Sequence, residues 1–497
     1  MPKRVAIVDI GSNSARVVIY QRTSRFGFHL IAQKKANVRI SEGSFEQDGI
    51  LQDIAIKRTI EALHIFKTMI NEYKARKTVA IATAAVRNAP NKNSFIRRVR
   101  NEVGLNIKVI DGNKEAFYGA TAVKNLLPLN SNSITIDIGG GSTDIAFIEG
   151  KRVIDTISLN IGTITIKELF FDKNRPLSEA REYILSEVKK IPDDFLNAQK
   201  AVAIGGVLRA LAKSIMLQTH YSYKKIHAFG YNYRQHSKHM ERIINANNRE
   251  HLDELFIKSS RYDTIRQGVL IFTTLVEYLD INTILTSGVG VREGLFLHDM
   301  LRGVGGVFPE ELNPSIVSIQ DRLDIIKIPK NRRIQIVKSL YKVLASKFDD
   351  KKEDYLKLLM DAIKISDSGK TLTIYNEHKH TYYIATQELN WQYTHKQMLL
   401  IAAILRSSPE KLLYKRLQRA HKELLPSKKT VRWLSFIYTL SSTLAIYNTL
   451  NNYNFYYKNR KLTICDRAQH PLLVEDIKSF ELPKDFEITF HNETTTQ

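Results

Sequence analysis

The chain has 497 residues and carries 74 Lys and Arg against 51 Asp and Glu, so its formal net charge is +23. With 43% hydrophobic and 25% charged residues it has a globular composition, which excludes a largely disordered chain. The single cysteine, Cys465, excludes a disulfide framework within the chain and any site that needs two thiolates. The positive excess is compatible with a polyanionic partner and equally with a basic protein that stays soluble.

Neither a signal peptide nor a membrane span is expected. The apolar run Val5–Val8 is ended by Asp9 and is too short for a signal sequence. The stretch Trp433–Tyr447 is too short to span a bilayer and contains serine and threonine, so we expect a buried helix there. These features and the lone cysteine predict a cytoplasmic protein.

In chain order, strand and helix signals alternate through the first half. Apolar side chains recur at helical spacing between Ile56 and Tyr73, and short apolar runs bounded by turn residues indicate strands. The expected strands are at 5–10, 17–20, 78–82 and 107–110, and the expected helices are at 50–74 and 114–126.

The opening pattern then returns once. The segment Ile134–Ile148 lies over Ala6–Tyr20 without a gap when Asp137 is set on Asp9, and both copies show a strand, an aspartate, a turn of small residues and a second strand. We interpret this repeat as two lobes of similar topology that face each other across a cleft.

The alternation continues and then stops near residue 306. Helices are expected at 178–191 and 261–279, with strands at 201–204 and 283–285. Gly303–Gly306, with Pro309 and Pro314 after it, indicates a linker. Long helical patterns dominate beyond it, and strand signals return after Asn454. Residues 311–497 carry 30 Lys and Arg against 20 Asp and Glu, with a basic peak between Lys411 and Lys429.

The two turns of the repeat are suited to binding phosphate. Small residues let the backbone approach an anion closely, so that successive N–H groups point at it. An aspartate before each turn, Asp9 or Asp137, repels phosphate but can hold Mg²⁺ or its waters, and Asp144 adds a third carboxylate. Two ordinary hairpins with glycine turns are the alternative. The predicted phosphate-binding residues are Gly11, Ser12, Asn13, Ser14, Gly139, Gly140, Gly141, Ser142 and Thr143.

Seven segments together resemble the exopolyphosphatase/guanosine-pentaphosphate phosphohydrolase family, a branch of the actin-like superfamily that includes sugar kinases and heat-shock ATPases. They stand in the family's order between residues 8 and 296. They are VDIGSNSARVVIY at 8–20, IATAAVRNAPN at 81–91, IDGNKEA at 110–116, TIDIGGGSTDIA at 135–146, SLNIGTITIKELFF at 158–171, AIGGVLRALA at 203–212 and SGVGVREGLF at 287–296.

The resemblance implies an α/β fold of two actin-like, ribonuclease H-like lobes with a cleft between them, lobe I at 1–127 and lobe II at 128–306. It places the catalytic base at Glu115, which would orient and deprotonate a water, and a phosphate-clamping arginine at Arg87. It adds phosphate contacts from Gly205, Gly206 and Gly162, and secondary substrate contacts from Arg16 and Arg261.

Three positions depart from the family's pattern. Phe117 stands where the family usually has arginine, Asp144 where it usually has glutamate, and Val207 where it usually has threonine. The last change removes a hydroxyl group and with it one expected phosphate contact.

Residues 311–497 resemble the mainly α-helical domain of long family members, which is related to metal-dependent HD phosphohydrolases. The segment 365–389 carries this likeness but has no His-Asp dipeptide. His378, His380 and His395 are possible ligands if the first two lie on a strand or turn, but we favour a helical domain without its own metal. Its basic patch would guide a long polyanion or form a dimer interface, and a small sheet is expected at the end, with Cys465 in its core.

With the resemblance, the sequence therefore predicts a Mg²⁺-dependent phosphohydrolase that removes the terminal phosphate of inorganic polyphosphate, of guanosine pentaphosphate, or of both. A homodimer is expected, and neither a membrane nor nucleic acid is an expected partner. An actin-like ATPase or sugar kinase is the first alternative, and a non-enzymatic nucleic-acid-binding protein is the second. No zinc spacing, RNA-recognition signature or basic zipper supports the latter.

Overall fold

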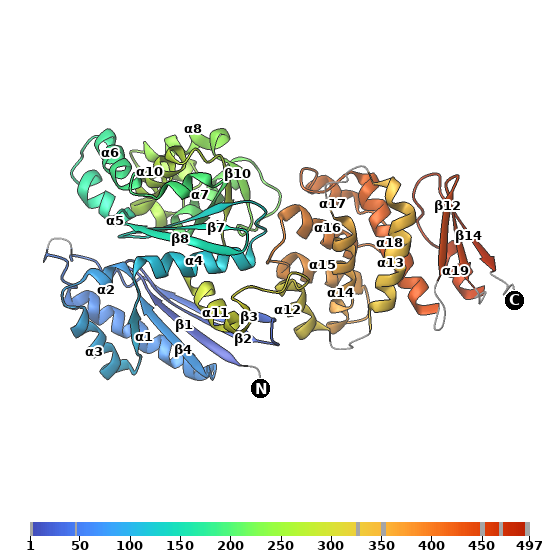
Figure 1. Cartoon of the computed structure of the whole chain (residues 1–497), viewed down its shortest axis with the longest axis horizontal. Coiled ribbons are helices and arrows are strands. Elements are labelled where there is room, and N and C mark those ends of the chain that lie inside the picture. Colours follow the sequence, from blue (N-terminus) through green and yellow to red (C-terminus); the bar gives the residue numbers. More distant parts are fainter. Residues whose placement is uncertain are drawn as a thin grey trace. The chain divides into compact units, whose positions relative to one another are not determined.

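The computed structural model describes residues 3–44, 47–324, 329–348, 354–447, 453–466 and 471–492. The chain divides into two compact units, Met1–Leu312 and Asn313–Gln497 (Figure 1). The division falls in the proline-containing stretch that the sequence indicates as a linker. None of the helices in the described ranges is both long and apolar enough to cross a membrane.

The first sheet has five strands in the order β3-β2-β1-β4-β5. All of the residues that set the helical spacing of α1 between Ile56 and Ile70 are buried in the core of this lobe, which confirms the helix expected there. The strands are β1 (Arg4–Ile10), β2 (Ala15–Arg22), β3 (Phe28–Ala36), β4 (Lys77–Ala82) and β5 (Ile107–Val109), and the helices are α1 (Asp53–Glu72), α2 (Ala84–Asn88) and α3 (Lys92–Val103).

The second sheet has six strands in the order β10-β11-β9-β6-β7-β8. They are β6 (Ser133–Ile138), β7 (Thr143–Glu149), β8 (Arg152–Leu159), β9 (Lys200–Ile204), β10 (Gly230–Asn232) and β11 (Thr283–Thr286). The helices are α5 (Thr163–Ile166), α6 (Leu177–Val188), α7 (Gly205–Gln218), α8 (Tyr233–Ile244), α9 (Arg249–Glu254) and α10 (Tyr262–Tyr278), with short helical turns at η2 (Lys167–Phe171), η3 (Asp193–Asn197), η4 (Ser259–Arg261) and η5 (Arg302–Val304).

The two lobes repeat one topology, as the sequence repeat predicts. In each, two antiparallel strands flank the aspartate-bearing strand on one side and parallel strands follow on the other. The register of the hairpins matches, because Asp9 lies opposite Arg16 and Asp137 lies opposite Asp144. The turns close in the same way: the Gly11 N–H donates to the Ser14 carbonyl (3.2 Å) and the Gly139 N–H to the Ser142 carbonyl (2.9 Å).

Two helices connect the lobes, α4 (Gly112–Leu126) and α11 (Val291–Leu301). Although α4 falls in the range expected for lobe I, it packs against β7 and β8 of the second sheet, and α11 from the expected lobe II packs on α4 and β1 (Figure 1). Gly294 permits this contact, since a Cβ there would lie 1.7 Å from the Tyr118 carbonyl oxygen. A boundary at residue 127 therefore separates the two sheets along the chain, but α4 packs on the sheet that lies beyond this boundary and α11 packs on α4 and β1.

The C-terminal unit is mainly helical and ends in a small sheet, as expected. Its helices are α12 (Pro314–Leu323), α13 (Asn331–Leu344), η6 (Ala345–Lys347), α14 (Tyr355–Lys364), η7 (Ser368–Thr371), α15 (Glu377–Glu388), α16 (His395–Leu405), α17 (Lys415–Ala420), α18 (Lys428–Tyr447) and α19 (Pro471–Lys478). The strands β12 (Asn454–Lys458), β13 (Lys461–Asp466) and β14 (Glu487–Asn492) form the sheet, and Cys465 is buried in it. The relation of the C-terminal unit to HD phosphohydrolases stays a prediction.

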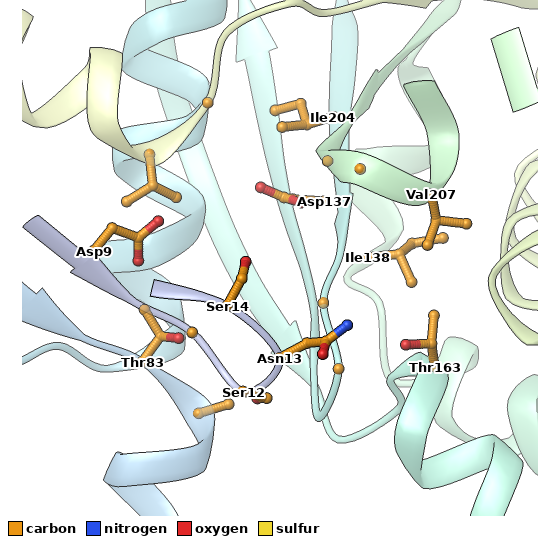
Figure 2. A pocket seen from close by; sticks show the side chains of 18 of the residues that line it. Asp9, Ser12, Asn13, Ser14, Thr83, Asp137, Ile138, Thr163, Ile204 and Val207 are labelled. Carbon is orange, nitrogen blue, oxygen red and sulfur yellow. The ribbon is translucent and has the colours of Figure 1, made fainter. Parts of the chain in front are cut away.

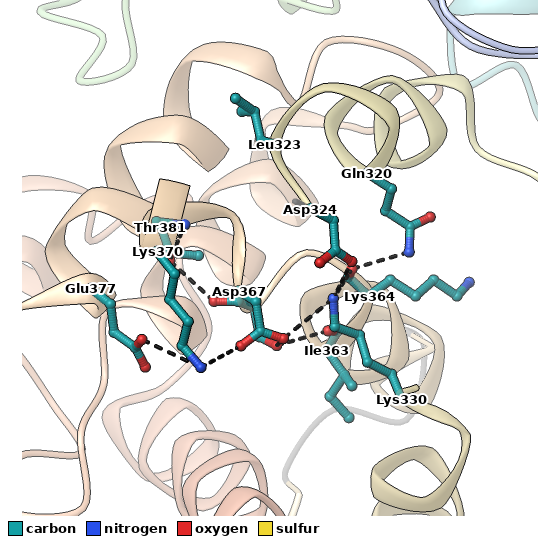
Figure 3. A network of polar contacts seen from close by, with 12 residues as sticks. Gln320, Leu323, Asp324, Lys330, Ile363, Lys364, Asp367, Lys370, Glu377 and Thr381 are labelled. Carbon is teal, nitrogen blue, oxygen red and sulfur yellow. Dashed lines mark hydrogen bonds and ion pairs between the residues drawn. The ribbon is translucent and has the colours of Figure 1, made fainter. Parts of the chain in front are cut away.

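A chain of ion pairs joins several of these helices (Figure 3). The Lys330 ammonium lies 2.6 Å from Asp324 and 3.3 Å from Asp367, and all three side chains are largely buried. Lys370 then joins Asp367 (2.8 Å) to Glu377 (3.6 Å) at the start of α15. The network ties the end of α12 and the start of α13 to η7 and α15.

The histidines expected as possible metal ligands do not converge. His378 and His380 lie on α15, so their placement on a strand or turn is wrong. Residues two apart on a helix point to different sides of it. His395 is buried at the start of α16.

Candidate active site

A cleft of about 210 Å³ lies between the two lobes and is lined by both glycine-rich turns (Figure 2). The carboxyl groups of Asp9 and Asp137 turn toward the space above Ser14. Most of the residues predicted from the sequence line this cleft: Asp9, Gly11, Ser12, Asn13, Ser14, Arg16, Glu115, Asp137, Gly139, Gly140, Ser142, Gly205, Gly206 and Arg261.

The two turns meet at Ser12 and Gly140. A Cβ on Gly140 would lie 3.0 Å from the Ser12 Cβ, so the close approach of the turns depends on the missing side chain. Because Gly11 and Gly139 use their N–H groups to close the turns, the N–H groups of Ser12, Asn13 and Gly140 are left without a protein partner among the described residues. Such unpaired amides are suited to bind phosphate oxygens.

A third phosphate-binding element starts at Gly205. There φ is +90°, a conformation that favours glycine, and a Cβ would lie 2.6 Å from the Asp137 Oδ1. Gly205 and Gly206 begin α7, so the unpaired N–H groups of this helix start at the cleft and favour an anion there. The Arg261 guanidinium packs directly over Gly206.

Glu115 stands in the first turn of α4. The helix is capped by Asp111, whose side chain accepts from the Lys114 N–H at 2.7 Å. The Glu115 Oε2 is buried without a hydrogen bond, and its nearest cation is the Arg87 Nη1 at 3.5 Å. Arg87 itself donates to the Ile110 carbonyl at 2.9 Å and does not line the cleft. The structure thus places Arg87 behind Glu115, where it orients the carboxylate.

The carboxyl groups at the cleft raise one another's pKa values. Burial raises the pKa of Glu115 well above its usual range, and the charges of Asp144, Asp9 and Asp137 add to the shift while Arg87 opposes it. Burial also raises the pKa of Asp137 to about 6 and that of Asp144 to about 7. For Asp9, burial raises the pKa and the ion pair with Arg292 opposes the shift. This crowding of acidic groups favours a cation in the cleft.

The donors fit Mg²⁺ only in part. Among the described residues, no three metal-ligating side chains converge on one point. Asp9 is paired with the Arg292 Nη1 at 3.0 Å, and Asp144 accepts from the Ser158 hydroxyl at 2.5 Å. The Asp137 side chain lines the cleft and has no ion pair or hydrogen bond within the described ranges. Mg²⁺ commonly uses one or two carboxylates and completes its shell with water and phosphate oxygens, a pattern that Asp137 and Asp9 fit.

Four predicted residues lie behind the turns rather than on the main wall of the cleft. The Thr143 hydroxyl donates to the Ile161 carbonyl (2.6 Å), and Asp144 is bonded to Ser158. Gly141 lines an adjoining pocket of about 250 Å³. Gly162 packs under the second turn, because a Cβ there would lie 2.2 Å from the Gly140 carbonyl oxygen. These residues support the shape of the turn.

Sequence reasoning missed several cations of the cleft. Lys35, Arg209 and Arg292 line it beside Arg16 and Arg261. Burial and the neighbouring Arg292 and Arg209 charges lower the pKa of Arg16 to about 10, which shows how closely these cations are gathered. A signal existed for Arg209, since it follows Gly205 by four residues and so lies one helical turn further along the same face.

The two lobes of equal topology, with paired turns and a helix start converging on one cleft, define an α/β phosphate-binding protein of the actin-like type. The model of the Ppx/GppA phosphatase family matches residues 18–303. The chain belongs to this family.

Relatives and solved structures agree with this membership. The chain is 25% identical over 388 residues to a guanosine-5'-triphosphate,3'-diphosphate pyrophosphatase of Pseudoalteromonas atlantica, covering 76% of this chain and 74% of that protein. It is 25% identical over 296 residues to a bifunctional 3-dehydroquinate synthase/phosphatase of Fusobacterium nucleatum, where the match covers 57% of this chain and only 44% of that protein. The solved PPX-GPPA enzyme of Aquifex aeolicus is similar at 30% identity with a TM-score of 0.51, over 60% of this chain and 99% of that one.

Proposed function

We propose that the protein hydrolyses phosphoanhydride bonds and removes the terminal phosphate of inorganic polyphosphate, of guanosine pentaphosphate, or of both. The observation that carries this proposal is the presence of Glu115 and both glycine-rich turns on the wall of one cleft. The name of one relative, a guanosine-5'-triphosphate,3'-diphosphate pyrophosphatase, supports this type of bond.

In the proposed reaction the turns and the start of α7 bind the phosphate oxygens through backbone N–H groups. The Glu115 carboxylate orients a water toward the terminal phosphorus and accepts its proton. Burial and the neighbouring acidic charges raise its pKa, which makes the carboxylate a stronger base. Arg87, 3.5 Å away, holds it in position.

We propose that Asp137 and Asp9 hold Mg²⁺ or its water ligands when substrate is bound. When bound, Mg²⁺ would neutralise charge on the phosphate chain. If so, removing divalent ions with EDTA abolishes phosphate release and added Mg²⁺ restores it, and Asp137→Asn raises the Mg²⁺ concentration needed for half-maximal rate. Full activity in EDTA would contradict the metal requirement.

The substrate is tested by measuring phosphate release from long polyphosphate and from guanosine pentaphosphate side by side. Both substrates are given to the wild type and to Glu115→Ala, and the variant should lose release from whichever substrate the wild type uses. The five cations of the cleft suit either substrate, since both carry a run of phosphates. Release from neither, or equal rates in the two proteins, would refute the proposal.

A kinase or ATPase of the actin-like type would use the same two turns, and the assay separates it. A kinase would pass phosphate from ATP to a small molecule, and an ATPase would release phosphate from ATP. In both, Glu115→Ala would leave nucleotide binding intact. The homodimer and the polyanion-guiding role of the basic segment between Lys411 and Lys429 stay predictions, which light scattering and the chain-length dependence of turnover would test.

A further inference from the structure

A second cavity, of about 420 Å³, lies in the C-terminal unit and shares no lining residue with the cleft. Four chain segments form it: the end of η6, the first turns of α18, the β12–β13 hairpin and the loop before β14. Its lining residues are Lys347, Lys429, Arg432, Trp433, Tyr457, Arg460, Pro483, Lys484, Asp485 and Phe486.

The lining is strongly basic. Five of its side chains are cationic and one, Asp485, is acidic. Asp485 lies 3.4 Å from Arg460, and Arg432 is paired with Glu481 at 3.2 Å. The positive charges of Lys347 and Lys484 are not matched by an acidic side chain of the lining. This excess of positive charge would attract an anion into the cavity.

The Arg432 guanidinium adds an independent sign of a ligand. Its Nη2 contacts Glu481, but its Nε is buried without a hydrogen-bond partner in the part of the chain that the structure describes. A buried N–H of a cation is costly to leave unpaired. An anionic oxygen in the cavity would satisfy it.

One wall of the cavity is aromatic. The rings of Trp433 and Phe486 meet edge to face at 4.9 Å, and Tyr457 lies nearly parallel to Phe486 at 6.2 Å. The Lys347 ammonium stands 4.4 Å from the centre of the Tyr457 ring. A flat apolar ligand group would gain contact area here that a bare phosphate chain cannot use.

We propose that this cavity binds a nucleotide, with its phosphates on the lysines and Arg432 and its base against the aromatic wall. Cations next to aromatic rings are the combination by which proteins bind a charged chain that carries flat bases. The proposal does not depend on the phosphohydrolase activity, because the cavity lies in the other unit and uses none of the cleft residues.

The chain has two tryptophans, Trp391 and Trp433, so Trp391→Phe leaves a single tryptophan, on the cavity wall, which can be excited selectively at a wavelength where tyrosine does not absorb. The full-length Trp391→Phe protein is titrated with a non-hydrolysable GTP analogue, with ATP and with inorganic tripolyphosphate. We expect saturable quenching of Trp433, with the nucleotides binding at least about 10-fold more tightly than tripolyphosphate. The lining of the cleft contains no tryptophan, and Glu115→Ala in the same background should quench equally, so failure of this proposal and failure of the proposed function can be told apart.

A charge-reversal pair tests the lysines. In the same background, Lys429→Glu with Lys484→Glu should weaken nucleotide binding by about 10-fold or more. The matched control, Lys415→Glu with Lys422→Glu, makes the same charge change at exposed positions outside the lining and should leave binding unchanged. Thermal melts check that both proteins fold.

Four outcomes would overturn the proposal. They are the absence of saturable quenching, equal binding of tripolyphosphate and nucleotides, equal weakening by both variant pairs, and far tighter binding of a single-stranded RNA than of GTP. The second would assign the cavity to an inorganic phosphate chain, and the last would assign it to nucleic acid.

Discussion

Replacing Glu115 by glutamine separates the chemistry of this side chain from its effect on folding. Glutamine keeps the shape of the side chain but cannot accept the proton of a water or carry the buried charge. A general base contributes on the order of 10²–10⁴-fold to the rate of a hydrolysis, so the rate of phosphate release by Glu115→Gln should fall by that factor. The same change should stabilise the fold, since natural active sites trade stability for function.

The sign of the stability effect follows from the raised pKa. Between the unfolded value of 4.5 and the higher folded value, the folded chain binds more protons than the unfolded chain, so wild-type stability falls as the pH rises through this window. Each proton bound by the folded chain alone changes the free energy of unfolding by about 1.4 kcal/mol per pH unit. The neighbouring Asp144 charge adds to the raised pKa of Glu115. Because Arg87 offsets part of it, we expect Glu115→Gln to be about 1–2 kcal/mol more stable than wild type at pH 8 and nearly equal at pH 5.

The assay combines phosphate release with urea unfolding at pH 5 and pH 8. Glu182→Gln, at an exposed position of α6, is the matched control and should change neither quantity. Wild-type turnover by Glu115→Gln would refute its role as the base. Lower stability of the variant at pH 8 would refute the electrostatic argument, since it would mean that the folded protein favours the charged carboxylate.

Three further changes test other parts of the molecule. Gly162→Ala places a Cβ 2.2 Å from the Gly140 carbonyl oxygen and should lower both phosphate release and the melting temperature. The control Gly303→Ala, which has open space around its Cβ, should change neither. Equal melting temperatures for the wild type and both variants would contradict this packing. Burial lowers the pKa of His239 to about 4, so between pH 4 and 6.5 the unfolded chain binds a proton at this side chain and the folded chain does not. The free energy of unfolding therefore falls on acidification through this window, by at most about 3 kcal/mol, and it should depend less on pH in His239→Gln. Lys330→Ala leaves the largely buried Asp324 carboxylate without its cation, whereas Asp367 keeps Lys370. It should destabilise the C-terminal unit by about 3 kcal/mol in urea unfolding, and a loss below about 1 kcal/mol would show that water replaces the ammonium.

The sequence repeat contained most of the information about the cleft. Setting Asp9 on Asp137 gave the hairpin register and the turns, because a hairpin is specified locally by its turn and its apolar alternation. The strand β3 was missed, since it ends in Gln33, Lys34 and Lys35 and lacks a simple apolar run. Its pairing with β2 comes from the sheet rather than from its own composition.

Tertiary contacts account for what the sequence could not show. Arg87 matches a motif, but its contact with Glu115 depends on how α2 and α4 are brought together. Nothing in the local sequence around Arg292 marks it as a cleft residue, because its partner, Asp9, lies 283 residues away in the chain. Long-range pairs of this kind leave no periodic pattern in a single sequence.

The packing of α4 determines which parts of the cleft travel together. Since α4 carries Glu115 and packs against β7 and β8, the acid rests on the sheet that bears the Gly139–Ser142 turn, while the Gly11–Ser14 turn belongs to the other sheet. A hinge motion between the two sheets would move Glu115 together with the Gly139–Ser142 turn and change the distance of both from the Gly11–Ser14 turn. Closure around a substrate would then bring the second turn and the acid to the phosphates in one movement.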